Sequence, residues 1–258
     1  MILSLNHVKK VFNPGTVDEK ILFNDFNFSM EKGDFVSIVG SNGSGKTTML
    51  NIICGSLPID GGEVVIAGKN VTGKHDFVRY RSIGRVYQDP KLGTCPNMTV
   101  LENMALAENK GKPFGLTACV GKKAEERYRE MLSPLGLGLE DRMHVKVGLL
   151  SGGQRQAMSL LMSTMTPLDF LILDEHTAAL DPKTAETIMI LTDRIVREKN
   201  LTALMVTHNL RYAVEYGSRL VMMHEGKAII DICGEEKKKT TVDDLLGTFY
   251  SISVERGN

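Results

Sequence analysis

The chain has 258 residues, of which 42% are hydrophobic, so it can bury a sizeable core and is not expected to be disordered. Its 31 basic residues balance 31 acidic ones, which leaves no overall field that would draw it to nucleic acid or to an anionic membrane surface. Its apolar runs are far shorter than the roughly 20 residues that cross a bilayer as a helix, so we expect any membrane attachment to go through a protein partner.

The cysteines and the N-terminus give no sign of export. The start of the chain lacks a basic region followed by a long apolar stretch, which a secretion signal would need. The cysteines are scattered without the paired spacings of a zinc site, and a disulfide framework would suit a small secreted protein. They are Cys54, Cys95, Cys119 and Cys233. We expect reduced, mostly buried thiols inside the cell.

The first sixty or so residues predict an antiparallel sheet. Asp60-Gly61-Gly62 separates two segments of strand-like content, and Gly33-Asp34 marks another turn. Beyond them, short apolar runs alternate with stretches of helical period, which is typical of a parallel sheet covered by helices. We expect central strands, buried on both faces, over residues 35–39, 170–173, 203–206 and 220–223.

A glycine-rich loop follows the first of these strands. It reads Gly40-Ser41-Asn42-Gly43-Ser44-Gly45-Lys46-Thr47, and a helical stretch begins at Thr48. Glycines let the backbone curl until its N–H groups point at phosphate oxygens, and the helix start adds the positive end of its dipole. Lys46 would reach the β- and γ-phosphates, and the Thr47 hydroxyl would bind Mg²⁺. The loop therefore predicts a nucleotide site.

Residues 89–166 carry a helical pattern that is broken repeatedly by proline and glycine, and they contain no convincing central strand. We interpret this stretch as an inserted helical subdomain. Near its end, Ser151-Gly152-Gly153-Gln154 opens a segment of helical period. Exposed N–H groups at a helix start, together with the Ser151 hydroxyl, would make a second anion site, although Ser151 could also simply cap the helix.

The strand expected over 170–173 ends in two carboxylates, Asp174 and Glu175. Open parallel sheets place their ligand sites at such strand ends. Asp174 would hold Mg²⁺ through water, and Glu175 would polarise the water that attacks the γ-phosphate. Taken alone the pair could be a solubilising junction, but the phosphate loop in the same chain favours the catalytic interpretation. A helix expected over 184–200 follows.

The run from Leu150 to Gln154, placed ahead of an acidic strand end, resembles the signature of the ATP-binding cassette (ABC) family, whose motifs follow in order from about Phe12 to Gly226. The resemblance implies an α/β fold: a P-loop NTPase core with a parallel sheet over residues 1–88 and 167–258, an N-terminal antiparallel β subdomain, and the inserted α-helical subdomain over 89–166. It also implies that the signature completes the ATP site of a partner copy in a head-to-tail homodimer.

The resemblance assigns roles to further residues. Gln88 is similar to a glutamine that senses Mg²⁺, His208 to a histidine that contacts the γ-phosphate, and Phe12 to an aromatic that stacks on adenine. Asp181 is similar to a residue that reaches across the dimer, although Asp181-Pro182 could equally be a plain helix start. A buried core ring is the alternative for Phe12. The family commonly has proline after the acidic pair, where this chain has His176, but the intact pair keeps hydrolysis in place.

The full expectation is an ATPase with Glu175, His208 and Lys46 as catalytic residues. The metal ligands would be Thr47, Gln88 and Asp174. The nucleotide contacts would be Phe12, Gly40, Ser41, Asn42, Gly43, Ser44, Gly45, Lys46, Thr47, Thr48, Gln88, Ser151, Gly152, Gly153, Gln154 and Asp181.

The resemblance places this ATPase on the cytoplasmic face of the cell membrane. It would drive permease subunits that also work with an extracellular or periplasmic substrate-binding protein. One bacterial importer subgroup that it resembles includes members assigned to aromatic amino acids. The alternatives are an ABC exporter or lipoprotein extractor, and a soluble ABC protein acting on ribosomes or DNA. The neutral charge weighs against a nucleic-acid partner.

Overall fold

The computed structural model describes residues 1–112 and 120–254, which divide into two compact units. Unit 1 combines Met1–Asp76 with the residues from Thr202 onward, and unit 2 runs over Phe77–Leu201. Unit 2 is wider than the helical subdomain expected over 89–166. Within the described ranges, none of the helices has both the length and the apolar composition that crossing a bilayer requires.

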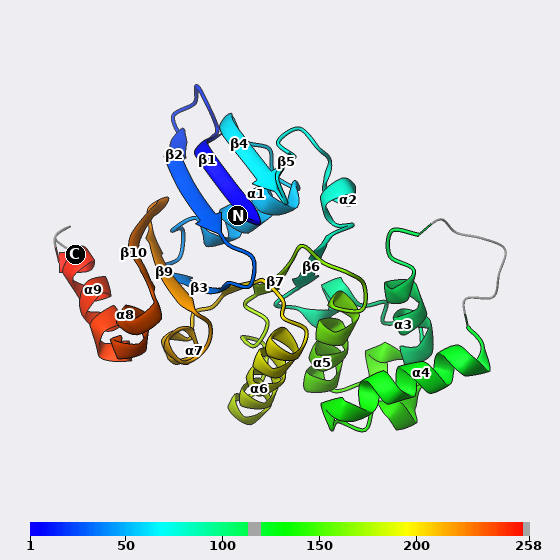
Figure 1. Cartoon of the computed structure of the whole chain (residues 1–258). Helices are drawn as coiled ribbons and strands as arrows, with labels where there is room; N and C mark the ends of the chain where they lie inside the picture. Colours follow the sequence, from blue (N-terminus) through cyan, green and yellow to red (C-terminus); the bar gives the residue numbers. More distant parts are fainter. Residues whose placement is uncertain (113–119, 255–258) are drawn as a thin grey trace. The chain divides into compact units, whose positions relative to one another are not determined.

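An antiparallel sheet forms the N-terminal part of unit 1, as expected. Its strands lie in the order β2-β1-β4-β5 and are drawn side by side in blue and cyan in Figure 1. They are β1 (Leu3–Phe12), β2 (Lys20–Met30), β4 (Gly61–Ile66) and β5 (Lys69–Asn70). Each neighbouring pair is antiparallel, and the pairing of β1 with β2 contains register shifts that mark bulges.

The parallel strands of unit 1 surround β3 (Phe35–Gly40), which pairs in parallel with β8 (Ala203–Val206) and β9 (Arg219–His224). Every residue of β3 and β8 is buried, as their largely apolar sequences predict for strands covered on both faces. The antiparallel strand β10 (Lys227–Cys233) lies beyond β9. The helix α1 (Lys46–Cys54) follows β3.

The C-terminal helices complete unit 1. They are α7 (Leu210–Glu215), α8 (Gly234–Lys239) and α9 (Val242–Val254). Fully buried Ala213 and Leu245 pack with Val39 of β3 and Leu220 of β9 in one hydrophobic cluster. The red helix α9 in Figure 1 is therefore tied to the same core as β3.

Unit 2 is built around one parallel strand pair, β6 (Ile83–Val86) with β7 (Phe170–Asp174). Its helices are α3 (Val100–Glu108), α4 (Lys122–Leu132), α5 (Gly152–Ser163) and α6 (Pro182–Glu198), and the short α2 (Asp76–Arg79) begins at its boundary. Short 3₁₀ turns are η1 (Pro90–Gly93), η2 (Ser133–Leu135), η3 (Glu140–Arg142) and η4 (Val147–Leu149). Between 89 and 166 the described residues hold no strand beyond an isolated bridge from Thr99 to Lys146.

The cysteines correct one expectation. All three described cysteines are free thiols, and Cys54 is buried in α1, but Cys95 and Cys233 are exposed. The expectation of mostly buried thiols is therefore wrong for these two. Cys95 follows the turn η1, and Cys233 ends β10, so neither lies in a packed element interior. Cys119 lies outside the described residues.

His176, the residue after the acidic pair, is buried against α6. Its Nε2 lies 3.1 Å from the Thr192 hydroxyl oxygen, and that hydroxyl donates to the Ile188 carbonyl at 2.7 Å. Because the hydroxyl proton is already used, Nε2 must be the donor in the first contact. Burial lowers the pKa of His176 to about 4, so this imidazole is neutral in the folded protein.

We predict that His176 makes folding sensitive to acid. Below pH ~6.5 the unfolded imidazole takes up a proton, whereas the buried one stays neutral until the pH approaches 4. Protonation therefore favours the unfolded chain, so the free energy of unfolding is not reduced by this residue above pH ~6.5 and falls as the pH drops toward 4. Between pH 7.5 and pH 5, His176→Gln should lose about 2 kcal/mol less unfolding free energy than the wild type. Urea unfolding at both pH values measures this, and equal losses in the two proteins would contradict it.

Candidate functional site

The phosphate loop in unit 1 is closed by its own lysine. β3 ends at Gly40, and α1 begins at Lys46. The Lys46 ammonium donates to the Gly40 carbonyl at 2.7 Å and to the Ser41 carbonyl at 3.0 Å, and the lysine is 5% exposed. These bonds hold a positive charge inside the curve of the loop, where phosphate oxygens would be bound.

The loop forms a cradle that side chains would fill. Gly40 has φ +158, and a Cβ placed there would lie 2.3 Å from the Met223 carbonyl oxygen. Gly45 has φ +106, in the left-handed region that favours glycine. The Ser44 hydroxyl is buried and meets no hydrogen-bond partner among the described residues. A buried hydroxyl donor beside a lysine fits phosphate oxygens, which are acceptors only.

His208 lies at the same sheet edge as this loop. β8 runs parallel to β3 with Val206 opposite Ile38, so the residues after Val206 and those after Ile38 leave the sheet in the same direction. The Thr207 amide still donates to the Ile38 carbonyl at 3.1 Å, and Asn209 caps α7 through the Tyr212 amide. The exposed His208 is thus presented between two anchored neighbours.

Phe12 ends β1 and pairs with Lys20. Its ring is half-buried, and the Lys10 ammonium lies 5.6 Å from the ring centroid. The ring is therefore not a fully buried core residue. Its contact with adenine stays a prediction.

The acidic strand end in unit 2 contains an ion pair that sequence reasoning missed. Asp174 is the last residue of β7, and its Oδ2 accepts a hydrogen bond from Arg85 Nη2 at 2.7 Å. The Arg85 side chain is 8% exposed and that of Asp174 is 15% exposed. The signal in the sequence was a basic residue within the short apolar strand 83–86. Gln88 follows that strand and is exposed.

Glu175, next to Asp174, has an unusual backbone. Its φ is +47, a left-handed conformation that costs a side-chain-bearing residue about 1–3 kcal/mol. The turn is closed by the Ala178 amide, which donates to the Glu175 carbonyl at 2.9 Å. Non-glycine residues in this conformation often occur at functional sites, which agrees with the catalytic role expected for this carboxylate.

The signature residues begin α5, as expected. Ser151 is the N-cap: its hydroxyl accepts from the Gln154 amide at 3.2 Å, and the Gln154 side chain accepts from the Ser151 amide at 3.1 Å. The packing of α5 against α6 requires glycine at position 153, because a Cβ there would lie 2.4 Å from the Thr184 methyl carbon of α6. The cap considered as the alternative for Ser151 is therefore present.

Asp181 is also a cap. Its side chain accepts from the Thr184 amide at 3.1 Å, and Pro182 occupies the first turn of α6. Hydrogen bonds from the Thr184 side chain and amide keep the pKa of Asp181 below its ordinary value. The plain helix start considered as its alternative is thus present, and a reach across a dimer stays a prediction.

The expected site residues are divided between the two units. Unit 1 holds Phe12, the loop from Gly40 through Thr48, and His208. Unit 2 holds Gln88, Ser151, Gly152, Gly153, Gln154, Asp174, Glu175 and Asp181.

Comparison with known proteins identifies the family. Residues 23–178, more than half of the chain, match the family model described as "ABC transporter". The chain is 44% identical over 248 residues to a tyrosine transport ATP-binding protein of Clostridioides difficile, covering 96% of this chain and 98% of that one. It is 32% identical over 230 residues to a putative hemin import ATP-binding protein, HrtA, of Staphylococcus haemolyticus, covering 88% and 99%.

A solved structure agrees with the sequence matches. It is the dimeric, post-hydrolysis state of the ATP-binding cassette MJ0796 bound to ADP and Pi, with a TM-score of 0.75 and 30% identity over 90% of this chain and 98% of that one. The expected P-loop NTPase fold is confirmed. The chain therefore belongs to the ABC transporter family and is an ATP-hydrolysing, ATP-binding member of it.

Proposed function

We propose that this chain is the ATP-binding subunit of an importer for a small solute such as an amino acid. The observation that carries the proposal is the 44% identity, over nearly the whole of both chains, to a protein named for tyrosine transport. Other relatives are named for the import of hemin and of methionine. In this proposal the subunit sits on the cytoplasmic face of the membrane and drives separate permease subunits, which work with a substrate-binding protein.

Unit 1 would hold the triphosphate. Backbone amides of residues 40–48 and the Lys46 ammonium would bind phosphate oxygens, with the Ser44 hydroxyl as a further donor. The aromatic face of Phe12 would stack on adenine. His208, exposed at the same sheet edge, would contact the γ-phosphate.

The donor set also fits Mg²⁺, which prefers oxygen ligands: Thr47 offers a hydroxyl, Gln88 an amide oxygen and Asp174 a carboxylate. When bound, Mg²⁺ neutralises charge that develops on the phosphates. Glu175 would accept hydrogen-bond donation from the attacking water and so raise its nucleophilicity.

The signature turn would serve a partner copy in a head-to-tail homodimer. The capping box uses the Gln154 amide, so the amides of Gly152 and Gly153 would be the donors toward phosphate. α5 spans 12 residues, enough for its dipole to favour an anion at this end. Asp181 would contact the partner near the same site. A related cassette is described as dimeric, which supports this arrangement.

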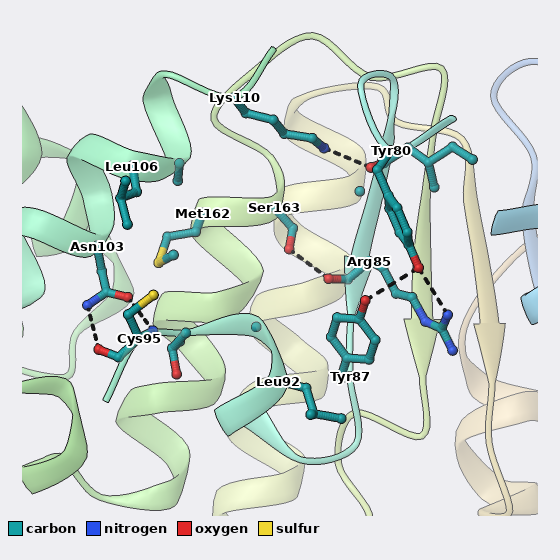
Figure 2. Close-up of a pocket in the computed structure, with 15 residues that line it drawn as sticks. Tyr80, Arg85, Tyr87, Leu92, Cys95, Asn103, Leu106, Lys110, Met162 and Ser163 are labelled. Atoms are coloured by element: carbon teal, nitrogen blue, oxygen red, sulfur yellow. Dashed lines mark hydrogen bonds between the residues drawn. The ribbon is translucent and has the colours of Figure 1, made fainter. Parts of the chain in front are cut away.

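A groove in unit 2 is the surface we propose for the permease. Its volume is about 430 Å³, and residues of β6, η1, α3 and α5 line it (Figure 2). Leu92 is 70% exposed and Leu106 is 43% exposed, so apolar side chains face outward on opposite walls. Burial lowers the pKa of Lys110 to about 8, and its ammonium donates to the Ile83 carbonyl at 2.8 Å. A short amphipathic helix of the permease would cover such a groove.

We predict that Glu175→Gln traps ATP and stabilises the homodimer. Without activation of the attacking water, ATP is not hydrolysed, and the ATP-bound dimer persists. ATP hydrolysis should fall by about 100-fold or more, and size-exclusion chromatography with ATP and Mg²⁺ should show a dimer. Glu235→Gln, which removes an exposed carboxylate on α8, is the control and should behave as wild type. A Glu175→Gln protein that stays monomeric under these conditions would argue against the shared site.

We predict that Leu92→Glu separates the subunit from its permease while leaving ATP binding unchanged, since a carboxylate in the apolar groove wall carries a desolvation cost. A tagged chain purified from detergent-solubilised membranes should bring down a multi-span permease, and the variant should not. Ile190→Glu, at a 58% exposed position on α6 outside the groove, is the matched control and should retain the permease. Ribosomes or DNA in place of a permease would overturn the proposed function.

A further inference from the structure

Arg85 places a charge in a strand that is otherwise apolar. Its neighbours Ile83 and Val86 are fully buried, and its own side chain is 8% exposed. A buried charge is costly unless it is paired and hydrogen-bonded. The bond to Asp174 meets that need, and it joins the acidic strand end to β6.

The guanidinium is held from its other side by the groove. Its Nη1 donates to the Tyr80 hydroxyl at 3.3 Å, and it lies over the Tyr87 ring at 4.8 Å from the centroid. The two tyrosine hydroxyls lie 3.4 Å apart, and the Arg85 carbonyl accepts from Ser163 of α5 at 3.2 Å. Tyr80, Tyr87, Ser163 and Arg85 itself all line the groove, as Figure 2 shows.

We propose that Arg85 is the positioning residue for Asp174 and that it links the groove to the metal-binding carboxylate. By holding Oδ2, Arg85 would fix the orientation of the carboxylate that is proposed to hold the metal. An occupant of the groove that moves either tyrosine would move the guanidinium and, with it, Asp174. This inference rests on the proposed roles of Asp174 and of the groove, and it names how the permease would regulate hydrolysis.

Arg85 could act on the metal site through its charge or through the position it gives Asp174, and removing it would change metal-dependent binding in opposite directions in the two cases. A positive charge near Mg²⁺ would repel it, so if charge alone mattered, removing Arg85 would strengthen metal-dependent binding. If position matters, removing Arg85 would weaken it, because groups that orient a metal ligand typically contribute 10–100-fold in affinity. The planar guanidinium reaches Tyr80 and Asp174 together, which a lysine ammonium cannot do in the same way.

The test measures how much Mg²⁺ strengthens binding of the non-hydrolysable analogue AMP-PNP to the full-length chain, as the ratio of Kd in EDTA to Kd with Mg²⁺. Arg85→Met should lower this ratio about tenfold and leave the Kd in EDTA unchanged. Arg85→Lys should restore part of the ratio. Arg127→Met, which removes an arginine paired with Glu108 elsewhere in unit 2, is the control and should match wild type.

Tyr80→Phe tests the link to the groove and keeps the proposal testable if Arg85→Met does not fold. Loss of its hydroxyl should lower the ratio about two- to fivefold, and adding the same change to Arg85→Met should have no further effect because both act through one contact. An unchanged or higher ratio in folded Arg85→Met, or an unchanged ratio in Tyr80→Phe, would overturn the inference alone. A wild type without any metal-dependent strengthening would overturn the proposed metal site, and this inference with it.

Discussion

The turn at Gly40 is the constraint on which the nucleotide site depends. β3 is buried at each residue, and the carbonyl of Met223 leaves no room for a side chain where that strand ends. The chain must therefore leave the sheet through a bare backbone, whose curve brings the Lys46 ammonium onto the carbonyls of Gly40 and Ser41. Because β8 runs parallel to β3, the same edge also receives His208.

In unit 2 an ion pair, not a glycine turn, lies at the ends of the parallel strands. Its two strands end side by side, and a buried ion pair between Arg85 and Asp174 joins them. Glu175, one residue further, has a left-handed backbone and follows a different course from its neighbour. The two adjacent residues thus differ: the Asp174 carboxylate is paired with a guanidinium, whereas Glu175 has a left-handed backbone. That difference is the physical basis for giving them separate tasks.

The sequence predicted those parts of the molecule that depend on local pattern. Short, largely apolar runs identified β3 and β8, and glycine spacing identified the phosphate loop, because both signals lie within a few residues. A basic residue within the short strand 83–86 indicates that Arg85 needs a partner, but that partner, Asp174, lies 89 positions away, so no local pattern identifies it. Exposure of the thiols depends on what packs around each loop. Lys237, in a block of charges, is buried and donates to the Val214 and Tyr216 carbonyls, which composition alone does not indicate.

The residues of the signature turn can serve two purposes, one in the fold of a single copy and one at the site of a partner copy. Ser151 and Gln154 cap α5, and Gly153 allows that helix to approach α6, so the fold of a single copy already accounts for these residue types. The proposed role toward the nucleotide of a partner is separate from both of these, because it involves a second copy.

Mixing two defective proteins tests that role most directly. In a head-to-tail dimer, a Lys46→Ala copy supplies an intact signature, and a Ser151→Arg copy supplies an intact phosphate loop, so one complete site forms in each mixed dimer. Each variant alone should lack ATPase activity, and the mixture should regain it. A mixture as inactive as its components, although the two copies associate, would contradict the shared site.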